Sequence, residues 1–225
     1  VVACFILTSA VCLADAVKDI TVLSTTDIHA FLSNQDVARL GSILSEERLK
    51  DSEAILVDCG DTVIGTYPGY SSRGMIGIQY LNDLKYDFWT PGNHEFDRGL
   101  PLLQGQIAAF RGKTLMANIN LKQAGADVAP FSVIERKGLA IAVIGLSYPT
   151  LNRFYYADED FTLFDLEPTM KKVMPEVKRA KPDIIILVSH FSINNSQKLQ
   201  RIVEEYPEIN LIVAGHTHKV INRKI

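Results

Sequence analysis

Short runs of apolar, often β-branched residues alternate along the chain with segments in which apolar residues recur every three or four positions. The first pattern is typical of buried strands and the second of amphipathic helices. We expect strands at residues 20–24, 54–57, 88–90, 114–117, 131–135, 140–146, 184–188 and 211–214. We expect helices at residues 37–49, 75–84, 100–110, 168–179 and 197–206. Strands that alternate with helices predict an α/β domain with the helices outside the sheets.

One pair of expected strands indicates how the sheets are built. Residues 131–135 and 140–146 are separated by a short stretch that contains Arg136, Lys137 and Gly138, which predicts a β-hairpin. A hairpin joins antiparallel strands, so we expect mixed rather than purely parallel sheets. In α/β folds ligands bind at the carboxyl ends of the strands, and the chemistry of this chain is therefore sought there.

The composition narrows the class of protein. The 225 residues are 47% apolar and carry 23 basic against 26 acidic side chains, for a formal net charge of −3. This is too apolar and too weakly charged for a disordered chain. It also lacks the basic surplus with which proteins bind nucleic-acid polymers. We expect a folded domain that does not bind a nucleic-acid polymer, and nothing in the composition indicates an oligomeric state.

The amino end is an almost unbroken apolar stretch. Residues 1–14 are too few for a membrane span, which needs about 20, and they lead into the small-x-small sequence Ala14-Asp15-Ala16. This pattern predicts the apolar region and cleavage site of a secretory signal; a buried first strand or helix is the alternative. We therefore expect residues 1–16 to be the remnant of a signal and residues 17–225 to form the mature domain.

The cysteines indicate the cellular compartment in which the protein is located. Cys4 and Cys12 would leave with the signal, and Cys59 alone cannot form an internal disulfide. An exported protein without disulfides is typical of the bacterial periplasm or cell surface. A lipid anchor at Cys4 is left open.

Five of the expected strands are followed, at their carboxyl ends, by residues of the types that bind metals. All five histidines of the chain lie at these positions, together with carboxylates and an asparagine. The candidate metal ligands are Asp27, His29, Asp61, Asn93, His190, His216 and His218. One cation takes about four to six ligands, so this set is too large for one ion and suits two if one carboxylate bridges them.

The ligand types predict the metals and the reaction. Mixed imidazole, carboxylate and amide ligands suit divalent Zn, Mn, Fe or Co. Two such ions about 3.5–4 Å apart can share a hydroxide, lower its pKa and clamp the oxygens of an in-line phosphoryl displacement. His94 lies next to Asn93 and three residues before Asp97. A histidine held by a carboxylate is a candidate general acid for the leaving oxygen.

Five sequence blocks in a fixed order resemble a known family. They are Thr26-Asp27-Ile28-His29, Gly60-Asp61, Gly92-Asn93-His94-Glu95-Phe96-Asp97, His190 and Ala214-Gly215-His216-Thr217-His218. This order is similar to that of the calcineurin-like metallophosphoesterase superfamily, and most similar to its secreted 5′-nucleotidase and 2′,3′-cyclic-nucleotide phosphodiesterase branch. The resemblance spans residues 20–218.

The resemblance implies a fold and a role for each matching residue. The fold would be a two-sheet mixed β-sandwich flanked by helices, in four αββα layers. One metal would be held by Asp27, His29, Asp61 and His218, and the other by Asp61 as the bridge with Asn93, His190 and His216. His94 would contact the phosphate or protonate the leaving group, oriented by Asp97.

The resemblance also implies a substrate class and a longer protein. The substrates would be nucleoside monophosphates, cyclic nucleotides or nucleotide sugars. In the nucleotidase branch a carboxy-terminal domain binds the nucleoside, and we expect that domain and the last strands of the catalytic domain to be absent from this chain.

Two alternatives remain open. The same metal site could cleave another ester, of the nucleotide-sugar or thiosulfohydrolase type, or the chain could be a metal-bound binding module without turnover. The set of Asn93, His94 and Asp97 favours an enzyme, because a binding module has no need of an acid and its orienting carboxylate. We expect Asp58 and Glu95 to support the site and Cys59 to be a small buried residue. We also expect residues 65–73 to form a loop beside the site and the aromatic residues at 154–156 to serve in packing.

Overall fold

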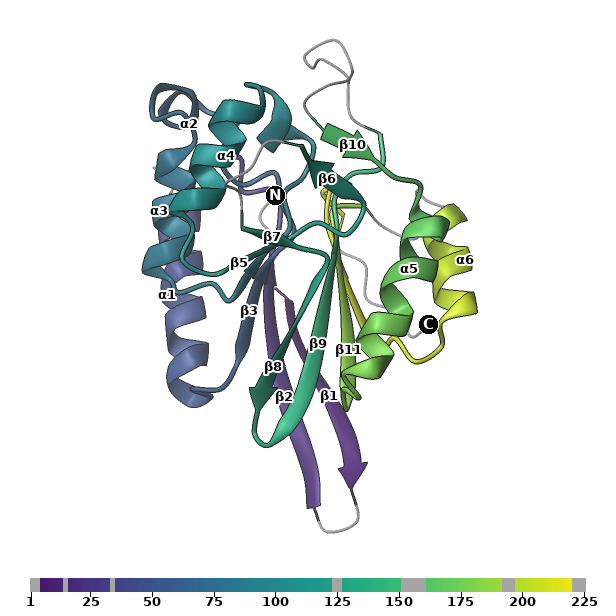
Figure 1. Ribbon diagram of the computed structural model, residues 1–225. Coiled ribbons are helices and arrows are strands. Elements are labelled where there is room, and N and C mark those ends of the chain that lie inside the picture. The colour runs from purple at the N-terminus through teal and green to yellow at the C-terminus, as the bar shows by residue number, and fades with distance from the viewer. Residues whose placement is uncertain are drawn as a thin grey trace.

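Two β-sheets pack face to face, with helices on the outer side of each (Figure 1). The structure is a computed structural model that describes residues 5–13, 16–32, 35–122, 127–150, 161–191 and 197–219. The strands are Phe5–Leu13 (β1), Ala16–Thr25 (β2), Ile55–Asp58 (β3), Phe88–Trp89 (β4), Lys113–Leu115 (β5), Ile119–Leu121 (β6), Val128–Ala129 (β7), Phe131–Arg136 (β8), Leu139–Leu146 (β9), Phe161–Leu163 (β10), Ile184–Ser189 (β11) and Leu211–Ala214 (β12). The helices are Gln35–Lys50 (α1), Tyr67–Ser71 (α2), Met75–Asp83 (α3), Leu100–Ala109 (α4), Leu166–Arg179 (α5) and Gln197–Glu205 (α6), with a 3₁₀ turn at His94–Phe96 (η1).

Both large sheets are mixed. The first has the order β1-β2-β3-β4-β5-β7, in which β1 is antiparallel to β2 and all other neighbours are parallel. The second has the order β12-β11-β9-β8, in which only the β8–β9 pair is antiparallel. A small antiparallel pair, β6 and β10, lies beside them. The predicted hairpin is confirmed, with Lys137 and Gly138 both at positive φ in its turn, as tight hairpin turns require.

The strands are apolar throughout because both of their faces are buried. In β3, Ile55 and Val57 point into the core between the sheets, and Leu56 points outward into the core under α1, α3 and α4. In β11, Ile186 faces the inter-sheet core and Leu187 faces α5 and α6. Strands covered on both faces appear in the sequence as continuous apolar runs rather than alternating ones. The three cores between four layers confirm the predicted αββα sandwich.

The structure differs from the predicted elements in a few places. Residues 65–73 were expected to be a loop, and this is wrong for the segment Tyr67–Ser71, which forms α2 with Pro68 in its first turn. Proline is well tolerated there because the first N–H groups of a helix have no partner within it. Helix α5 begins at Leu166 rather than at residue 168. The aromatic residues 154–156 lie outside the described residues.

At the amino end, residues 5–13 form β1, which pairs with β2 along its whole length at the edge of the first sheet. The predicted signal at residues 1–16 stays a prediction. No helix among the described residues is both long and apolar enough to cross a membrane.

Candidate metal centre

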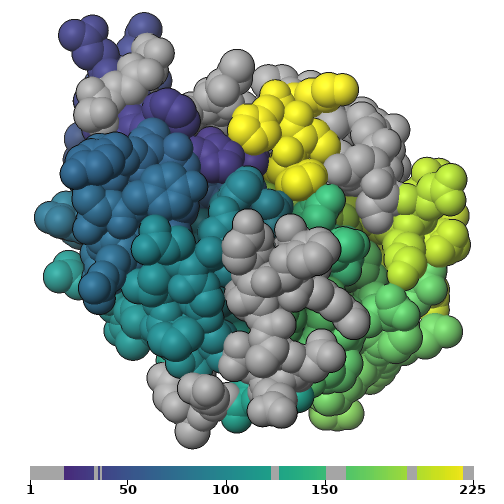
Figure 2. Space-filling model, turned by 90° about the horizontal axis from the view of Figure 1, so that it is seen from above, coloured from purple at the N-terminus to yellow at the C-terminus, as the bar shows by residue number. Residues whose placement is uncertain are grey.

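The carboxyl ends of parallel strands from both sheets meet at one edge of the sandwich. Strands β2, β3 and β4 of the first sheet, and β11 and β12 of the second, are each followed by predicted ligands. Seen from above, the segment after β12 (yellow) lies beside the segment after β2 (purple), although they are at opposite ends of the chain (Figure 2). The fold therefore brings the first and the last of the five sequence blocks together.

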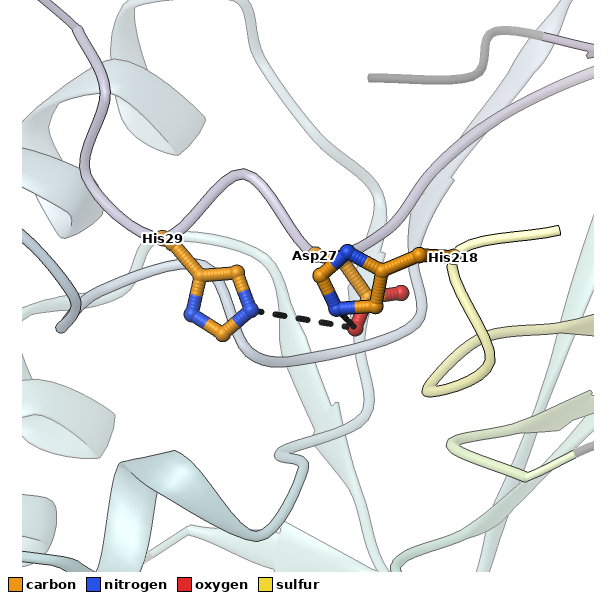
Figure 3. Close-up of side chains that lie close together, drawn as sticks. All are labelled: Asp27, His29 and His218. Carbon is orange, nitrogen blue, oxygen red and sulfur yellow. Dashed lines mark ion pairs between the residues drawn. The ribbon is translucent and has the colours of Figure 1, made fainter. Parts of the chain in front are cut away.

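One group of ligands joins the loop after β2 to the loop after β12. Asp27, His29 and His218 offer ligand atoms that all lie within 4.8 Å of one another. The Asp27 Oδ1 atom lies 3.2 Å from His218 Nε2 and 4.0 Å from His29 Nε2 (Figure 3). In the close-up both rings turn their Nε2 atoms toward the same carboxylate oxygen, which is the arrangement expected of three ligands around one ion.

A second group joins the loop after β3 to the ends of β11 and β12. Asp61, His190 and His216 again offer ligand atoms within 4.8 Å of one another. The Asp61 Oδ2 atom lies 2.9 Å from His190 Nε2, and both side chains are almost completely buried. Burial disfavours a charged imidazole, but the nearby Asp61 carboxylate outweighs it and raises the pKa of His190 to about 9. The site thus favours positive charge beside Asp61.

The two groups are tied together by backbone hydrogen bonds. The N–H of His216, in the second group, donates to Asp27 Oδ2 at 2.9 Å, and the N–H of His29, in the first group, donates to the carbonyl of Asp61 at 2.8 Å. Gly92 lies between the loops, where a Cβ would contact Asp61 Oδ1 and His190. Only a glycine leaves room for this close approach.

Two buried oxygens of the site accept no hydrogen bond from any described residue. They are Oδ1 of Asp27 and Oδ1 of Asn93. Buried polar atoms are nearly always partnered, so both oxygens are available to a ligand. Together with the imidazoles and Asp61, they form a mixed oxygen and nitrogen set that suits a borderline divalent cation. The residues present fit two metal ions.

The backbone of the site is held in an uncommon conformation. Asp27, His29, Asp61, His216 and His218 all have φ between 52° and 71°. This left-handed region is unfavourable for residues with a Cβ, and it persists where surrounding contacts hold it, often at functional sites.

Two buried carboxylates support the ligand loops from behind. Glu95 accepts hydrogen bonds from four backbone N–H groups, those of Asp61, Thr62, Val63 and Gly92, at 2.6–3.1 Å. Asp58 accepts hydrogen bonds from Thr25 Oγ1, Thr62 Oγ1 and the N–H of Gly60. Burial raises the pKa of both carboxyls, that of Asp58 to about 7. These contacts confirm the expectation that Asp58 and Glu95 support the site.

Two of the ligand imidazoles are oriented through their other ring nitrogen. Nδ1 of His29 lies 3.1 Å from the carbonyl oxygen of Ile64, and Nδ1 of His190 lies 2.6 Å from that of Cys59. An Nδ1–H that donates to a carbonyl fixes the tautomer and leaves Nε2 free to bind a metal. Cys59 is buried and free, as expected, and it contributes its backbone rather than its thiol.

His94 and Asp97 form a pair at the rim of the centre. His94 Nδ1 lies 2.6 Å from Asp97 Oδ2, and the N–H of His94 donates to Asp61 Oδ1 at 2.8 Å. The hydrogen bond with Asp97 raises the pKa of His94 to about 9, with the Asp61 charge adding to the effect against the cost of burial. The His94 side chain is 44% exposed, so the structure places it between the ligands and solvent.

Sequence reasoning missed Tyr148, whose ring lies 4.2 Å from the ring of His216, centroid to centroid. Tyr148 follows β9, which runs parallel to β11, so it too lies at a carboxyl end. The search of strand ends for metal-binding residue types passed over it because tyrosine is not among them. Its neighbour Ser147 forms hydrogen bonds with Asn118 and with the carbonyl of Pro91. No sequence pattern indicated these contacts.

Comparisons with known proteins agree with this geometry. A family model described as calcineurin-like phosphoesterase matches residues 20–220. The chain is 26% identical to the 2′,3′-cyclic-nucleotide 2′-phosphodiesterase/3′-nucleotidase of Haemophilus influenzae, over 92% of this chain and 37% of that protein. It is 29% identical to the 5′-nucleotidase of Vibrio cholerae, over 92% of this chain and 42% of that protein.

The fold has a counterpart among solved structures. The crystal structure of the calcineurin-like phosphoesterase YfkN from Bacillus subtilis superposes with a TM-score of 0.78 at 23% identity, over 91% of this chain and 74% of that chain. The chain spans about two fifths of the length of the two curated relatives above, 37% and 42%. Since the family model covers almost the whole chain, from residue 20 to residue 220, the chain belongs to the calcineurin-like phosphoesterase family.

Proposed function

We propose that this chain hydrolyses phosphoesters with two divalent transition-metal ions and that its substrates are nucleotides. The observation that carries the proposal is the pair of ligand groups at one edge of the sandwich, with a histidine–carboxylate pair at their rim. A module that only binds metal needs the first feature but not the second.

Each ion has its own ligands in this proposal. Asp27, His29 and His218 would hold one ion, and His190 and His216 would hold the other. Asn93 would complete the second ion's set, which the buried, unpartnered Oδ1 of its side chain supports, and Asp61 would be shared by the two ions. Zn, Mn, Fe and Co are the candidate metals. Two such ions, when bound, supply Lewis-acid stabilisation of phosphoryl oxygens and an activated water at neutral pH.

His94 acts on the leaving group. Its Nδ1 is engaged by Asp97, so the other ring nitrogen is left for the substrate. A protonated imidazole there donates to the departing oxygen, and the Asp97 carboxylate stabilises the charge of the ring. Because the His94 N–H also bonds to Asp61, the acid is held in a fixed position relative to the ligand that bridges the ions.

The substrate class is supported by the relatives. Those named above are a cyclic-nucleotide phosphodiesterase/3′-nucleotidase and a 5′-nucleotidase, and both names describe enzymes that act on phosphoesters of nucleotides. The metal-binding residues themselves recognise a phosphoryl group and not a base. Nucleotide sugars, thiosulfohydrolase-type esters and a binding role without turnover are the competing outcomes of the test.

A hydrolysis screen tests the proposal. The chain is reconstituted with Mn²⁺ or Co²⁺ and offered p-nitrophenyl phosphate, bis(p-nitrophenyl) phosphate, mononucleotides, 2′,3′-cyclic nucleotides and nucleotide sugars. We expect release of phosphate or nitrophenol that depends on metal, and slower hydrolysis of the nucleotides in the His94→Ala variant. A chain that binds two ions per molecule yet hydrolyses none of these compounds would contradict the proposal in favour of a binding module or of a thiosulfohydrolase-type enzyme.

We further propose that the protein is exported to the bacterial periplasm or cell surface and that residues 1–16 are removed. The apolar sequence of residues 1–14 and the Ala14-Asp15-Ala16 motif support this. Strand β1 pairs only with β2 at a sheet edge, so its removal leaves every ligand-bearing strand with a partner. Mass spectrometry of the mature amino terminus tests this proposal. A terminus near Val17 is expected, and an intact terminus in the secreted fraction would overturn the cleavage.

A further inference from the structure

The histidines of the candidate metal centre differ in the groups that orient their rings. His29 and His190 each place Nδ1 beside a backbone carbonyl, and His94 places Nδ1 beside Asp97. Within the described part of the chain, the ring nitrogens of His216 have no such oxygen acceptor. A metal-binding histidine without an anchoring hydrogen bond needs another restraint on its ring, because a freely rotating side chain loses more entropy when it binds.

Tyr148 supplies a restraint of a different kind. The centroids of the Tyr148 and His216 rings lie 4.2 Å apart with an interplanar angle of 39°, and the ring of His190 lies 6.2 Å from Tyr148 in an edge-on arrangement. Contact between aromatic rings is favourable beyond the area that it buries. Tyr148 therefore contacts both histidines of the group that contains Asp61.

Tyr148 is itself held in place. Its ring packs against the apolar core under α1, α3 and α4 and against the core under α5 and α6. The residue before it, Ser147, is fully buried: it exchanges two hydrogen bonds with Asn118, and its hydroxyl donates to the carbonyl of Pro91 at 2.6 Å. A ring fixed from behind in this way can fix the ring that lies against it.

We propose that Tyr148 is a positioning residue of the metal centre: its ring orients His216 by packing against it at a tilt, in place of the hydrogen bond that orients His29 and His190. This rests on the proposed function, because it assigns His216 to an ion. The aromatic ring, rather than the phenol hydroxyl, carries the effect. The inference therefore predicts that phenylalanine replaces Tyr148 and that an aliphatic side chain of similar bulk does not.

The test compares Tyr148→Leu with Tyr148→Phe. Leucine keeps apolar bulk between the two cores and removes the aromatic partner, whereas phenylalanine keeps the ring. Tyr67→Leu is the matched control, since Tyr67 is 83% exposed. To separate the two ions, each substitution is also made in a His218→Ala background, in which only the ion held by His190 and His216 keeps its full ligand set. Co²⁺ affinity is measured by titration calorimetry, and the d–d absorption of bound Co²⁺ reports ligand geometry.

In the His218→Ala background, Tyr148→Leu should weaken Co²⁺ binding by roughly 10–100-fold, the range seen when residues that orient metal ligands are lost. It should also change the Co²⁺ absorption, while Tyr148→Phe and Tyr67→Leu leave both as they were. Unchanged affinity and spectrum in Tyr148→Leu would overturn the inference, as would equal loss in Tyr148→Phe. If the unsubstituted chain binds no ion, the proposed function fails instead, so the two failures are distinct. A thermal melt of each metal-free variant confirms that the chains compared are folded.

Discussion

The two halves of the metal centre are built differently. In the half formed by Asp61, His190 and His216, the first two side chains are 2% and 0% exposed, and Glu95 holds the loop that carries Asp61. In the half formed by Asp27, His29 and His218, the side chain of Asp27 is buried but that of His218 is 45% exposed. We call these the buried half and the open half.

The two halves differ in how far the fold positions their ligands before any metal binds. In the buried half, Glu95 and the carbonyl of Cys59 lie in the interior and hold the Asp61 loop and the His190 ring, and the partly buried ring of Tyr148 packs against His216. In the open half, His218 contacts the Asp27 carboxylate at 3.2 Å and the ring of His29, with centroids 5.3 Å apart, but its side chain is 45% exposed. A more fixed set of ligands loses less entropy on binding, so the ion in the buried half should bind more tightly.

The largest effect should come from the residue that we place between the halves. Asp61→Ala removes a ligand from both ions, so both should be lost and metal-dependent hydrolysis should fall to background. Elemental analysis of the reconstituted chain measures this. Asp127→Ala is the control, because its side chain is 84% exposed and far from the ligands in sequence. Retention of one ion in Asp61→Ala would refute the bridging role.

The next largest effect should separate chemistry from metal binding. His94→Ala leaves the candidate ligands in place and removes the proposed general acid, so hydrolysis should slow by roughly 10²–10⁴-fold while the metal content stays the same. Steady-state rates on an alkyl phosphate, whose leaving group needs a proton, give the clearest reading. A rate equal to that of the unsubstituted chain would reject His94 as a catalytic residue.

Glu95→Gln should damage the buried half more than the open one. The carboxylate accepts four backbone N–H bonds, and an amide can accept at only one of its two positions, so buried donors lose their partner. Each such loss costs about 1–3 kcal/mol of stability. Thermal unfolding and Co²⁺ titration check this, with the exposed Glu135→Gln as control. Equal loss of affinity at both ions would remove the distinction between the halves.

The smallest effect on stability is expected for His218→Ala. Its side chain is nearly half exposed, so the free energy of unfolding of the metal-free chain should change by no more than about 0.5 kcal/mol. The ion of the open half should still be lost, leaving one ion per chain. A large drop in the melting temperature of the metal-free chain would show that the open half is also part of the folded core.

The sequence predicted well those features that depend on local pattern. Continuous apolar runs identified the strands that are buried on both faces, such as those containing Ile186 and Val57. Histidine, a residue type with few structural uses, occurs directly after several of these strands. The rule that ligands bind at carboxyl ends of strands then brought the candidates to one edge. The short strands β6, β7 and β10 were missed, although the equally short β4 and β5 were expected at residues 88–90 and 114–117. Two or three residues are too few for a periodic pattern to appear.

The features that depend on contacts across the sandwich could not be predicted from local sequence patterns. The proximity of Asp27 and His218 follows from how the two sheets face each other, and the sequence order alone does not fix it. The four donors to Glu95 and the packing of Tyr148 against His216 are side-chain contacts between distant segments. Such contacts are set by packing, which has no period along the chain.

Anomalous diffraction from crystals grown with Mn²⁺ tests the central claim most directly. Two peaks about 3.5–4 Å apart are expected, one among Asp27, His29 and His218 and the other beside Asn93, His190 and His216, with the Asp61 carboxylate between them. A single peak, or peaks away from these side chains in crystals of the folded chain, would contradict the account of a two-metal centre.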